Sequence, residues 1–382
     1  MAKWFEKRLD EIAEFNPRES LKKGSIAKKI SMDKLQPFCR DVPGFESEPY
    51  SGGTKFRNGD TIMARITPCL ENGKTAKVSV LENGEVGFGS TEYIVFRAKD
   101  GCDSDFLYYL VTSSIVRGPA IKSMVGSSGR QRVQTDVLQT LMVKVPDLET
   151  QQSISGILKS LDDKIAANRK INDNLEQQAR ALYQRMFIDN PVSGGYMGTL
   201  SDIADITMGQ SPNGSSYNED GNGAVFFQGR AEFGFRFPSV RLYTTEPKRM
   251  ACANDTLMSV RAPVGDLNVA YTDCCIGRGL AAIHSKSNQQ SFVLYTMFSL
   301  HKQLDVFNGE GTVFGSINRT SLTELPIFIP SDREIVKFEA IVAPIDAAIR
   351  NNYEEICRLE KIRDALLPKL MSGELDVSAV EL

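Results

Sequence analysis

The sequence predicts an α+β fold in which two β-rich domains are separated by two long helices, packed as an antiparallel coiled coil with a pseudo-twofold internal repeat. Three observations predict it: a gap-free repeat, a 3.5-residue spacing of apolar residues in both copies, and runs of β-branched and aromatic residues before each copy. A length of 382 residues with 41% apolar composition is sufficient for two hydrophobic cores.

The repeat aligns residues 143–187 with residues 327–371 at a constant offset of 184. Asp162 then matches Asp346, and Glu176 matches Glu360. The preceding segments repeat more loosely: GDTIMARITP at 59–68 resembles NDTLMSVRAP at 254–263. The chain is therefore expected to contain two copies of one structural plan.

Breaks by Gly, Asn and Pro separate the short β-branched and aromatic runs of each β-rich part, and each part is followed by a long segment with helical periodicity. We therefore divide the chain into four segments. They are a first β-rich domain at 1–147, a first long helix at 148–190, a second β-rich domain at 191–330, and a second long helix with the C-terminal tail at 331–382. We call the two β-rich domains the first and second head.

Apolar residues advance by alternating steps of four and three along both helices, which is typical of a coiled-coil seam. The steps place a charged residue, Arg363, in the second seam. We expect antiparallel helices at 148–187 and 332–371, with Asn168 or Asn172 meeting Asn352; the alternative is that each helix packs only on its own head. The predicted seam residues are Ile154, Leu158, Leu161, Ile165, Asn168, Asn172, Leu175, Leu182, Val342, Ile345, Ile349, Asn352, Ile356, Leu359 and Leu366.

Composition excludes several classes of protein. The seven cysteines contain no CxxC pair and the two histidines lie apart, so we expect no disulfide framework and no metal site; the adjacent Cys274 and Cys275 are expected to be structural. No apolar run is long enough for a membrane helix, and the N-terminus lacks the apolar core of a signal peptide, so we expect a cytoplasmic protein.

Net charge is −3, which is low for a protein that binds DNA without help. Residues 1–190 carry 28 Lys and Arg against 25 Asp and Glu, whereas residues 191–382 carry 17 against 23. If DNA is the ligand, a partner must supply part of the contact with phosphate.

Catalytic motifs are missing from the sequence. It contains no GxxxxGK[ST] phosphate loop, no HExxH, no GxSxG and no strand-linked GxGxxG. The tetrapeptides with which amino-methyltransferases hold a flipped base are also absent, since FNPRES at 15–20 matches them only partly. We therefore expect no catalytic residues in this chain.

The layout and several strings resemble the specificity subunits of type I restriction-modification systems. The strings are RDALLPKLMSGEL at 363–375, ITPCLENGKTAKV at 66–78, SGRQRV at 128–133, GQSPNGSSYNEDGNG at 209–223, FFQGRAEFGFRFP at 226–238, SVRAPVGDLNVA at 259–270 and CCIGRGLAAI at 274–283. After the first helix the chain departs from the C-terminal string, with ALYQRMFIDNP at 181–191, which suits a junction into the next domain.

The resemblance implies two target-recognition domains on double-stranded DNA, each recognising one half of a split sequence. It also implies two methylation subunits docked on the helices, and restriction subunits. Adenine methylation and ATP-dependent cleavage would belong to these partners, so S-adenosylmethionine, ATP and Mg are implied for them and no cofactor for this chain.

Basic residues on glycine-rich loops are the candidates for DNA contact, because Arg and Lys can reach guanine edges or phosphates. Each candidate has an alternative role as a solvated or ion-paired surface charge. Val313 and Phe314 are candidates for contact with a thymine methyl, although core packing is the simpler interpretation. The predicted DNA-binding residues are Arg65, Lys74, Lys77, Arg130 and Arg132 in the first head, and Arg230, Arg261, Arg278 and Arg319 in the second.

Two other interpretations remain open at this point. The chain could be a coiled-coil scaffold that joins two protein-binding β domains without nucleic acid, which a basic patch on both heads would contradict. The same architecture could also serve a fused or simplified restriction system with a different methylating partner. The target bases do not follow from the sequence, because recognition also depends on loop geometry and DNA deformability.

Overall fold

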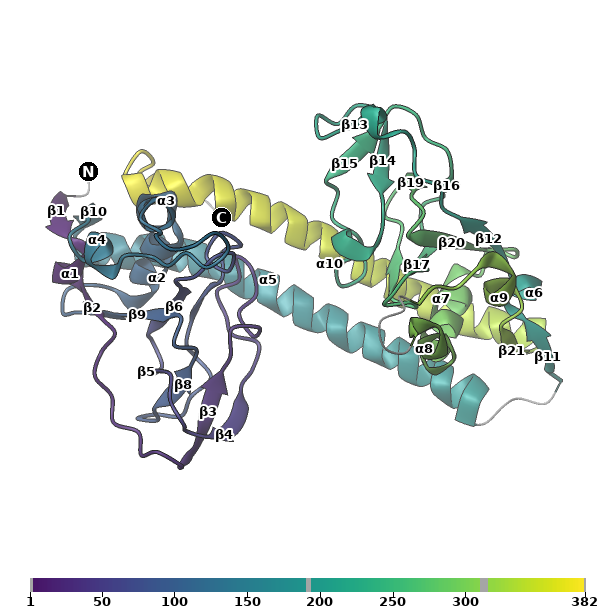
Figure 1. The fold of residues 1–382 in the computed structure, drawn as a ribbon, viewed down its shortest axis with the longest axis horizontal. Helices are drawn as coiled ribbons and strands as arrows, with labels where there is room; N and C mark the ends of the chain where they lie inside the picture. The colour runs from purple at the N-terminus through teal and green to yellow at the C-terminus, as the bar shows by residue number, and fades with distance from the viewer. Residues whose placement is uncertain (1–2, 190–193, 310–314, 381–382) are drawn as a thin grey trace. The chain divides into compact units, whose positions relative to one another are not determined.

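The computed structural model describes residues 3–189, 194–309 and 315–380. It divides into two compact units (Figure 1). Unit 1 comprises residues 1–170 and 352–382, and unit 2 comprises residues 171–351. The long helices α5 (Leu148–Tyr183) and α10 (Asp332–Ser372) each contribute one part to either unit. None of the described helices is long and apolar enough to cross a membrane.

Unit 1 contains three small sheets. Strand β1 (Trp4–Arg8) pairs antiparallel with β10 (Met142–Pro146). A four-stranded sheet has the order β2 (Ala13–Phe15), β9 (Tyr93–Ala98), β6 (Thr61–Ala64), β7 (Thr75–Lys77). Another has the order β4 (Glu46–Pro49), β3 (Ile26–Ile30), β8 (Gly87–Gly89), β5 (Thr54–Phe56). The shorter helices of this unit are α1 (Leu9–Ile12), α2 (Ser104–Thr112), α3 (Ser114–Lys122) and α4 (Thr135–Gln139), followed by a 3-10 turn at Val377–Ala379.

Unit 2 has the same kinds of sheet. Strand β11 (Tyr196–Thr199) pairs antiparallel with β21 (Pro326–Ile329). A four-stranded sheet has the order β12 (Ala204–Met208), β20 (Leu280–Ser285), β17 (Thr256–Ser259), β18 (Leu267–Val269). A five-stranded sheet has the order β13 (Tyr217–Asn218), β15 (Leu242–Thr244), β14 (Ala224–Phe227), β19 (Cys274–Ile276), β16 (Met250–Ala251).

The shorter helical elements of unit 2 lie around these sheets. They are α6 (Leu200–Ile203), α7 (Gln290–Ser299), α8 (His301–Asp305) and α9 (Arg319–Thr323), 3-10 turns at Gly214–Ser216, Arg230–Glu232 and Val306–Asn308, and a π-helical turn at Gln184–Asp189. Cys274 and Cys275 are buried in β19, and Cys274 belongs to a hydrophobic core cluster. The structural role predicted for this pair is therefore consistent with its position.

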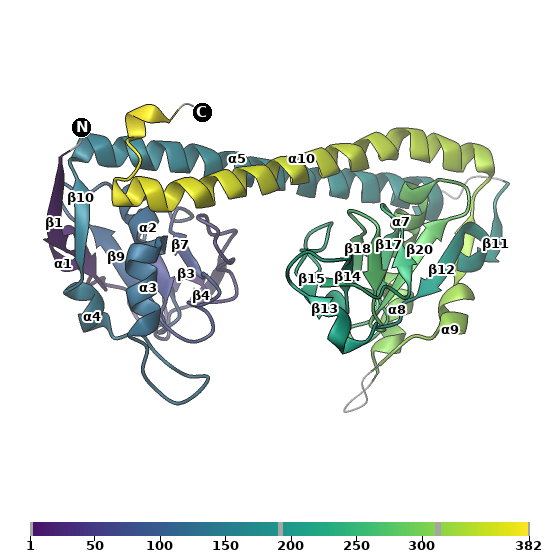
Figure 2. The same cartoon turned by 90° about the horizontal axis from the view of Figure 1, so that it is seen from above.

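In unit 1, helix α2 lies beneath the α5 and α10 segments (Figure 2). Its N-terminus is capped by Asp103, whose side chain accepts a hydrogen bond from the Phe106 N–H. The same carboxylate accepts a bond from the Ser155 hydroxyl of α5, and buried Ile154 and Leu158 of α5 join the core of this unit with Leu370 of α10. Helix α5 therefore packs both on its own head and beside α10.

The parts of α5 and α10 in unit 1 run antiparallel, because residues later in α5 contact residues earlier in α10. Asp162 binds Arg363 at 2.8 Å, whereas Asn168 donates a hydrogen bond to the Glu355 carboxylate, also at 2.8 Å. Arg363, the charged interruption in the predicted seam, is only 8% exposed and pairs with an equally buried carboxylate. The interruption is thus an internal ion pair.

The parts of α5 and α10 in unit 2 are also antiparallel neighbours. Asn172 donates a hydrogen bond to the Ile349 carbonyl at 3.2 Å, and the Tyr183 ring packs edge-on against Phe338. The predicted meeting of Asn168 or Asn172 with Asn352 stays a prediction, while the contacts described here pair these two asparagines with Glu355 and Ile349.

Every predicted seam residue is buried or half-buried. Leu175, Leu182, Ile345, Asn352, Leu359 and Leu366 are half-buried and the others are buried. The predicted start of the first long helix at 148 coincides with the first residue of α5, and α10 begins one residue after the predicted 331. The predicted boundary between 190 and 191 lies outside the described residues.

Candidate nucleic-acid interface

Four arginines line one pocket of about 420 Å³ in the second head. Arg261 follows β17, Arg278 lies between β19 and β20, and Arg230 and Arg241 flank the 230–241 loop. The pairing of β17 with β20 places the ends of these two strands side by side, since Ser259 is opposite Leu280. Three of the four basic residues predicted in this head are therefore brought together, and Arg241 is a fourth that sequence reasoning missed.

The four guanidinium groups differ in their partners. Arg230 forms an ion pair with Asp266, and Arg241 binds Glu232 at 3.0 Å. Arg261 and Arg278 are exposed, and within the described residues neither side chain has an acidic partner or a hydrogen bond. These two groups can therefore bind an anion without first giving up an internal ion pair.

Arg319 lies apart from this group. It is exposed at the first position of the short helix α9 and does not line the pocket. Arg241 follows Pro238 and Ser239 and precedes β15, outside the glycine-rich strings that guided the predictions. A search for arginines within three residues of a proline would have found it.

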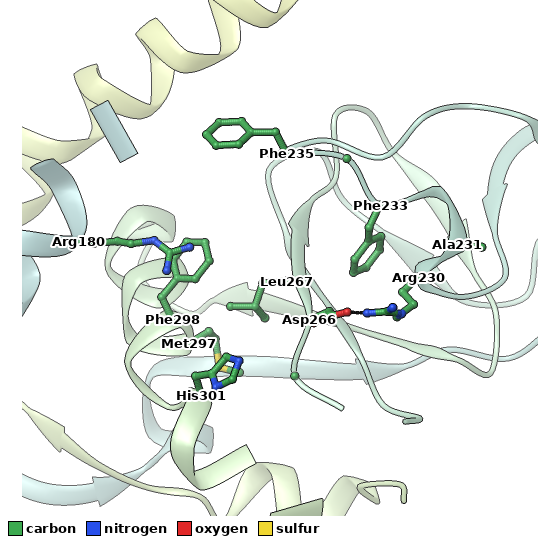
Figure 3. Close-up of a pocket in the computed structure, with 12 residues that line it drawn as sticks. Arg180, Arg230, Ala231, Phe233, Phe235, Asp266, Leu267, Met297, Phe298 and His301 are labelled. Atoms are coloured by element: carbon green, nitrogen blue, oxygen red, sulfur yellow. Dashed lines mark ion pairs between the residues drawn. The ribbon is translucent and has the colours of Figure 1, made fainter. Parts of the chain in front are cut away.

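A second pocket of about 640 Å³ adjoins the arginine group and shares Arg230 (Figure 3). The Arg230 guanidinium points at Asp266, and the Arg180 guanidinium lies 3.5 Å from the ring centroid of Phe298. Arg180 also binds Glu176 at 2.6 Å, so the two arginines of this pocket are already neutralised. This second pocket therefore attracts anions less strongly than the neighbouring arginine pocket does.

In the first head Arg65 and Arg132 share one carboxylate. Both guanidinium groups hydrogen-bond to Glu92, Arg132 at 2.7 Å and Arg65 at 3.3 Å. The bond from Arg132 is the main cause that lowers the pKa of the Glu92 carboxyl, with Arg65 adding to it and burial opposing it. Glu92 is therefore ionised at neutral pH, and it fixes both arginines at the head surface.

Backbone pairing places Arg130 beside these two residues. The Thr67 N–H donates to the Gln131 carbonyl and the Val133 N–H to the Arg65 carbonyl, so the 126–132 loop lies along the end of β6. Gly129 has φ +79°, a left-handed conformation that favours glycine, and the exposed Arg130 follows it. Arg65, Arg130 and Arg132 thus form the basic group of the first head.

Lys74 and Lys77 do not join this group. The Lys77 side chain is buried, with its ammonium bound to the Asp105 carboxylate and the Ser104 hydroxyl. Burial alone would raise the pKa of Asp105, but the bonds from Lys77 and Arg40 outweigh it and lower that pKa. Lys77 therefore stabilises the interior, and we withdraw it as a DNA contact because its charge does not reach the surface.

Lys74 is half-buried and donates a hydrogen bond to the Met32 carbonyl at 3.0 Å. Among the described residues its ammonium forms no ion pair. Val313 and Phe314, the candidates for contact with a thymine methyl, lie outside the described residues.

Comparison with known proteins gives one consistent likeness. The model of the type I restriction modification DNA specificity domain matches residues 1–177. The chain is therefore similar to the specificity subunits of type I restriction-modification systems, and the match to their DNA specificity domain covers its first 177 residues.

Two curated relatives illustrate the match. A protein described as the type I restriction enzyme MjaX specificity subunit of Methanocaldococcus jannaschii is 32% identical over 63% of this chain. This chain spans only 60% of the length of that relative. The type I restriction enzyme HindI specificity subunit of Haemophilus influenzae is 24% identical, over 88% of this chain and 89% of the relative.

A solved structure supports the fold. The S subunit of a type I restriction-modification system from M. genitalium superposes with a TM-score of 0.60 at 16% identity, covering 97% of this chain and 96% of that one. At this identity the likeness concerns the fold alone.

Proposed function

We propose that this chain is a specificity subunit that binds double-stranded DNA through both heads and recognises a target split into two halves. The observation that carries the proposal is the arginine pocket of the second head, where Arg261 and Arg278 are exposed without acidic partners among the described residues. Arginine hydrogen-bonds in a bidentate manner to guanine edges and phosphates, so such a group matches the chemistry of DNA.

The first head supplies the second half of the proposal. Its three arginines lie at the loop end of β6, and the arginine pocket lies at the loop end of β17, a strand of the same sheet order. Equivalent placement in two heads favours two recognition surfaces over one. An internal repeat with approximate twofold symmetry and an antiparallel coiled coil of α5 with α10 would present them to two half-sites.

Partner subunits complete the proposed activity. The net charge of −3 leaves the chain with little electrostatic attraction to DNA on its own. We propose that methylation subunits dock on the long helices and share the phosphate contacts, and that restriction subunits join the assembly. Adenine methylation and ATP-dependent cleavage would then be reactions of those partners, with S-adenosylmethionine, ATP and Mg bound by them.

The test is a DNA-binding titration of the chain with and without its methylation subunit, on DNA that carries the target and on unrelated DNA. We expect weak binding by the chain alone and tight, target-dependent binding by the complex. Tight specific binding by the chain alone at physiological salt would contradict the shared phosphate contact. A complex that binds no DNA would favour the protein-binding scaffold instead.

A further inference from the structure

Three side chains with metal-binding atoms meet in unit 2, and none of them lines the arginine pocket. Cys252 and Asp255 belong to the turn between β16 and β17, and His284 lies on β20. One ligand atom of each residue lies within 4.8 Å of the other two. The cysteine spacing predicts no zinc site, but this cluster depends on the pairing of β17 with β20, which joins residues about thirty positions apart.

Hydrogen bonds organise the cluster. The Asp255 carboxylate is buried, accepts a bond from the Cys252 N–H at 2.7 Å and lies 2.6 Å from His284 Nδ1. Asp273 is fixed next to it by the Ala253 N–H at 2.8 Å. Asp255, with burial and Asp273 assisting, raises the pKa of the Cys252 thiol, as expected of a site rich in negative charge.

The first head also has a buried aspartate, Asp60, at the backbone position equivalent to Asp255. Asp60 ends an equivalent turn, accepts a bond from the Arg57 N–H at 2.8 Å and is bound by both arms of Arg97 at 2.7 Å. Thr61 pairs with Phe96 and Thr256 pairs with Ile283, so Arg97 and His284 occupy matching positions on their strands. A buried carboxylate at this position is thus neutralised by a permanent cation in one unit and faces an imidazole in the other.

We propose that Cys252, Asp255 and His284 bind one zinc ion. A thiolate, a carboxylate and an imidazole are a mixed S, O and N ligand set of the kind zinc prefers. The two anionic ligands balance the charge of Zn²⁺, so the metal would neutralise Asp255 as Arg97 neutralises Asp60. The thiol proton passes to solvent when the Zn–S bond forms, and the hydrogen between Asp255 and His284 Nδ1 is released as the imidazole adopts its Nε2–H form.

The ligand atoms already lie close to the separations that a zinc site needs. In a tetrahedral zinc site the ligand atoms stand about 3.3–3.5 Å apart, given bond lengths of about 2.0–2.3 Å. One pair of ligand atoms is now 2.6 Å apart, and the other two pairs are no more than 4.8 Å apart. Cys252 and His284 are exposed, so the ion can enter from solvent and a water molecule can take the fourth position.

The site has a structural consequence within unit 2. Arg350 of α10 donates a hydrogen bond to the Asn254 side chain at 2.8 Å and another to the Tyr271 carbonyl at 2.8 Å, which holds the turn against the helix. A metal bound to Cys252 and Asp255, which lie on either side of Asn254 in the sequence, and to His284 on β20 would fix the same turn to the sheet. Zinc should therefore stabilise the packing of the sheet on α10.

Cobalt titration of the full chain tests the proposal, since Co²⁺ substitutes for zinc and reports its ligands by absorption. After removal of metals with a chelator, we expect one equivalent of Co²⁺ to give a thiolate-to-cobalt charge-transfer band and the visible bands of four-coordinate cobalt. Zinc should displace the cobalt and should raise the melting temperature of the chain.

Matched variants assign the ligands. Cys252→Ser should abolish the charge-transfer band, and His284→Ala should weaken binding at least as much as loss of an outer-shell partner does, about tenfold or more. Cys357→Ser, which removes a thiol from α10, should leave the titration unchanged. Absence of the band in the unaltered chain would overturn the proposal, as would a band that persists in Cys252→Ser or that is lost only in Cys357→Ser.

Discussion

The two heads present positive charge in different ways. Arg261 and Arg278 of the second head are exposed without acidic partners among the described residues, whereas Arg65 and Arg132 of the first head both bind Glu92. A free guanidinium gains its whole interaction with an anion. A paired one must first exchange its carboxylate, which costs affinity but fixes the direction of the side chain. The second head is therefore expected to contribute more affinity, and the first head a more rigid arrangement of its arginines.

The buried polar groups show a second contrast. Asp162 of α5 binds Arg363 and accepts a bond from the Tyr109 hydroxyl, both at 2.8 Å. Its repeat equivalent, Asp346 of α10, accepts a bond from the Tyr295 hydroxyl at 2.9 Å and binds Arg236 at 3.2 Å. Unit 1 thus has one internal acid for its arginine.

Unit 2 has two internal acids for its buried arginine, because Arg236 also binds Glu176 at 3.0 Å. The arginine of unit 2 therefore keeps a buried partner when Asp346 is lost. Without Asp162, the one acidic partner left to Arg363 among the described residues is Asp364, which is largely exposed.

The largest expected effect is a loss of stability, and it follows from the different number of acids around the two buried arginines. Asp162→Asn should destabilise unit 1 by about 3 kcal/mol, because it leaves Arg363 buried without its internal charge partner. Asp346→Asn should cost unit 2 only about 1 kcal/mol, the contribution of an ordinary hydrogen bond, since Arg236 keeps Glu176. Denaturant-dependent hydrogen exchange in peptides of each unit measures both losses.

Asp163→Asn is the matched control for the stability experiment. Asp163 neighbours Asp162 on α5 but is exposed, and its pairs with Lys159 and Arg40 should contribute less than about 1 kcal/mol. Equal losses for Asp162→Asn and Asp346→Asn would contradict the difference between the two buried clusters.

The next effect concerns DNA affinity. Replacing Arg261 and Arg278 together by Ala in the complex with the methylation subunit should weaken target binding by about 2 kcal/mol or more, roughly thirtyfold, since each bidentate contact contributes about 1–3 kcal/mol. The Arg65 and Arg132 double variant should lose less, because Glu92 already occupies both side chains. Fluorescence anisotropy with labelled duplexes measures both affinities.

Exposed basic residues away from the pocket provide the control for DNA affinity. Lys248→Ala with Lys302→Ala removes the same charge from the second head without altering the arginine pocket. If this control weakens target binding as much as the double arginine variant does, net charge and not the pocket determines affinity.

Glu92→Gln should have a smaller effect of opposite sign. The change removes the internal competitor of Arg65 and Arg132, so affinity for unrelated DNA should rise by about 0.5 kcal/mol, roughly twofold, within the range of exposed ion pairs. Discrimination of the target should fall, because the arginines lose their fixed direction. Unchanged affinity and discrimination across duplexes would show that Glu92 has no part in DNA recognition.

The smallest effect is a pH dependence of opposite sign in the two units. The pKa of Glu92 is lowered, chiefly by Arg132, so its stabilisation is present above its unfolded value of 4.5 and is lost as pH falls through the folded value. Burial raises the pKa of Asp346, so its contribution is present below 3.8 and is lost as pH rises through the folded value.

Hydrogen exchange corrected for intrinsic rates can separate these two contributions. Between about pH 6 and about pH 4, acidification should reduce protection around β9 relative to protection around α7. A larger loss of protection around α7 than around β9 would refute the opposite pH dependences assigned to Glu92 and Asp346.

The sequence predicts the long helices and their buried faces well, because helical periodicity is a local property. Helix α5 begins at the predicted residue 148, and Ile154, Leu158 and Ile165 are buried as the spacing requires. The role of Arg363 could not be predicted, since Asp162 lies about two hundred positions away. The presence of Arg363 in an apolar seam indicates only that this residue needs an acidic partner.

The candidate site was predicted in part. Arg230, Arg261 and Arg278 were chosen for their loop context, and strand pairing brings them together. Lys77 had the same local context, but it is on β7 with its side chain turned toward Asp105 of α2. Local sequence does not determine which side of a short strand faces the interior when both faces are covered.

Methylome sequencing of a head exchange tests the central claim most directly. A host would express the chain with its methylation subunit, and in parallel a chimaera in which another recognition domain replaces residues 1–147. We predict a methylated motif of two halves with an unread gap, of which the chimaera changes one half and keeps the other. A continuous motif in the parent, or a change of both halves in the chimaera, would contradict recognition of one half-site by each head.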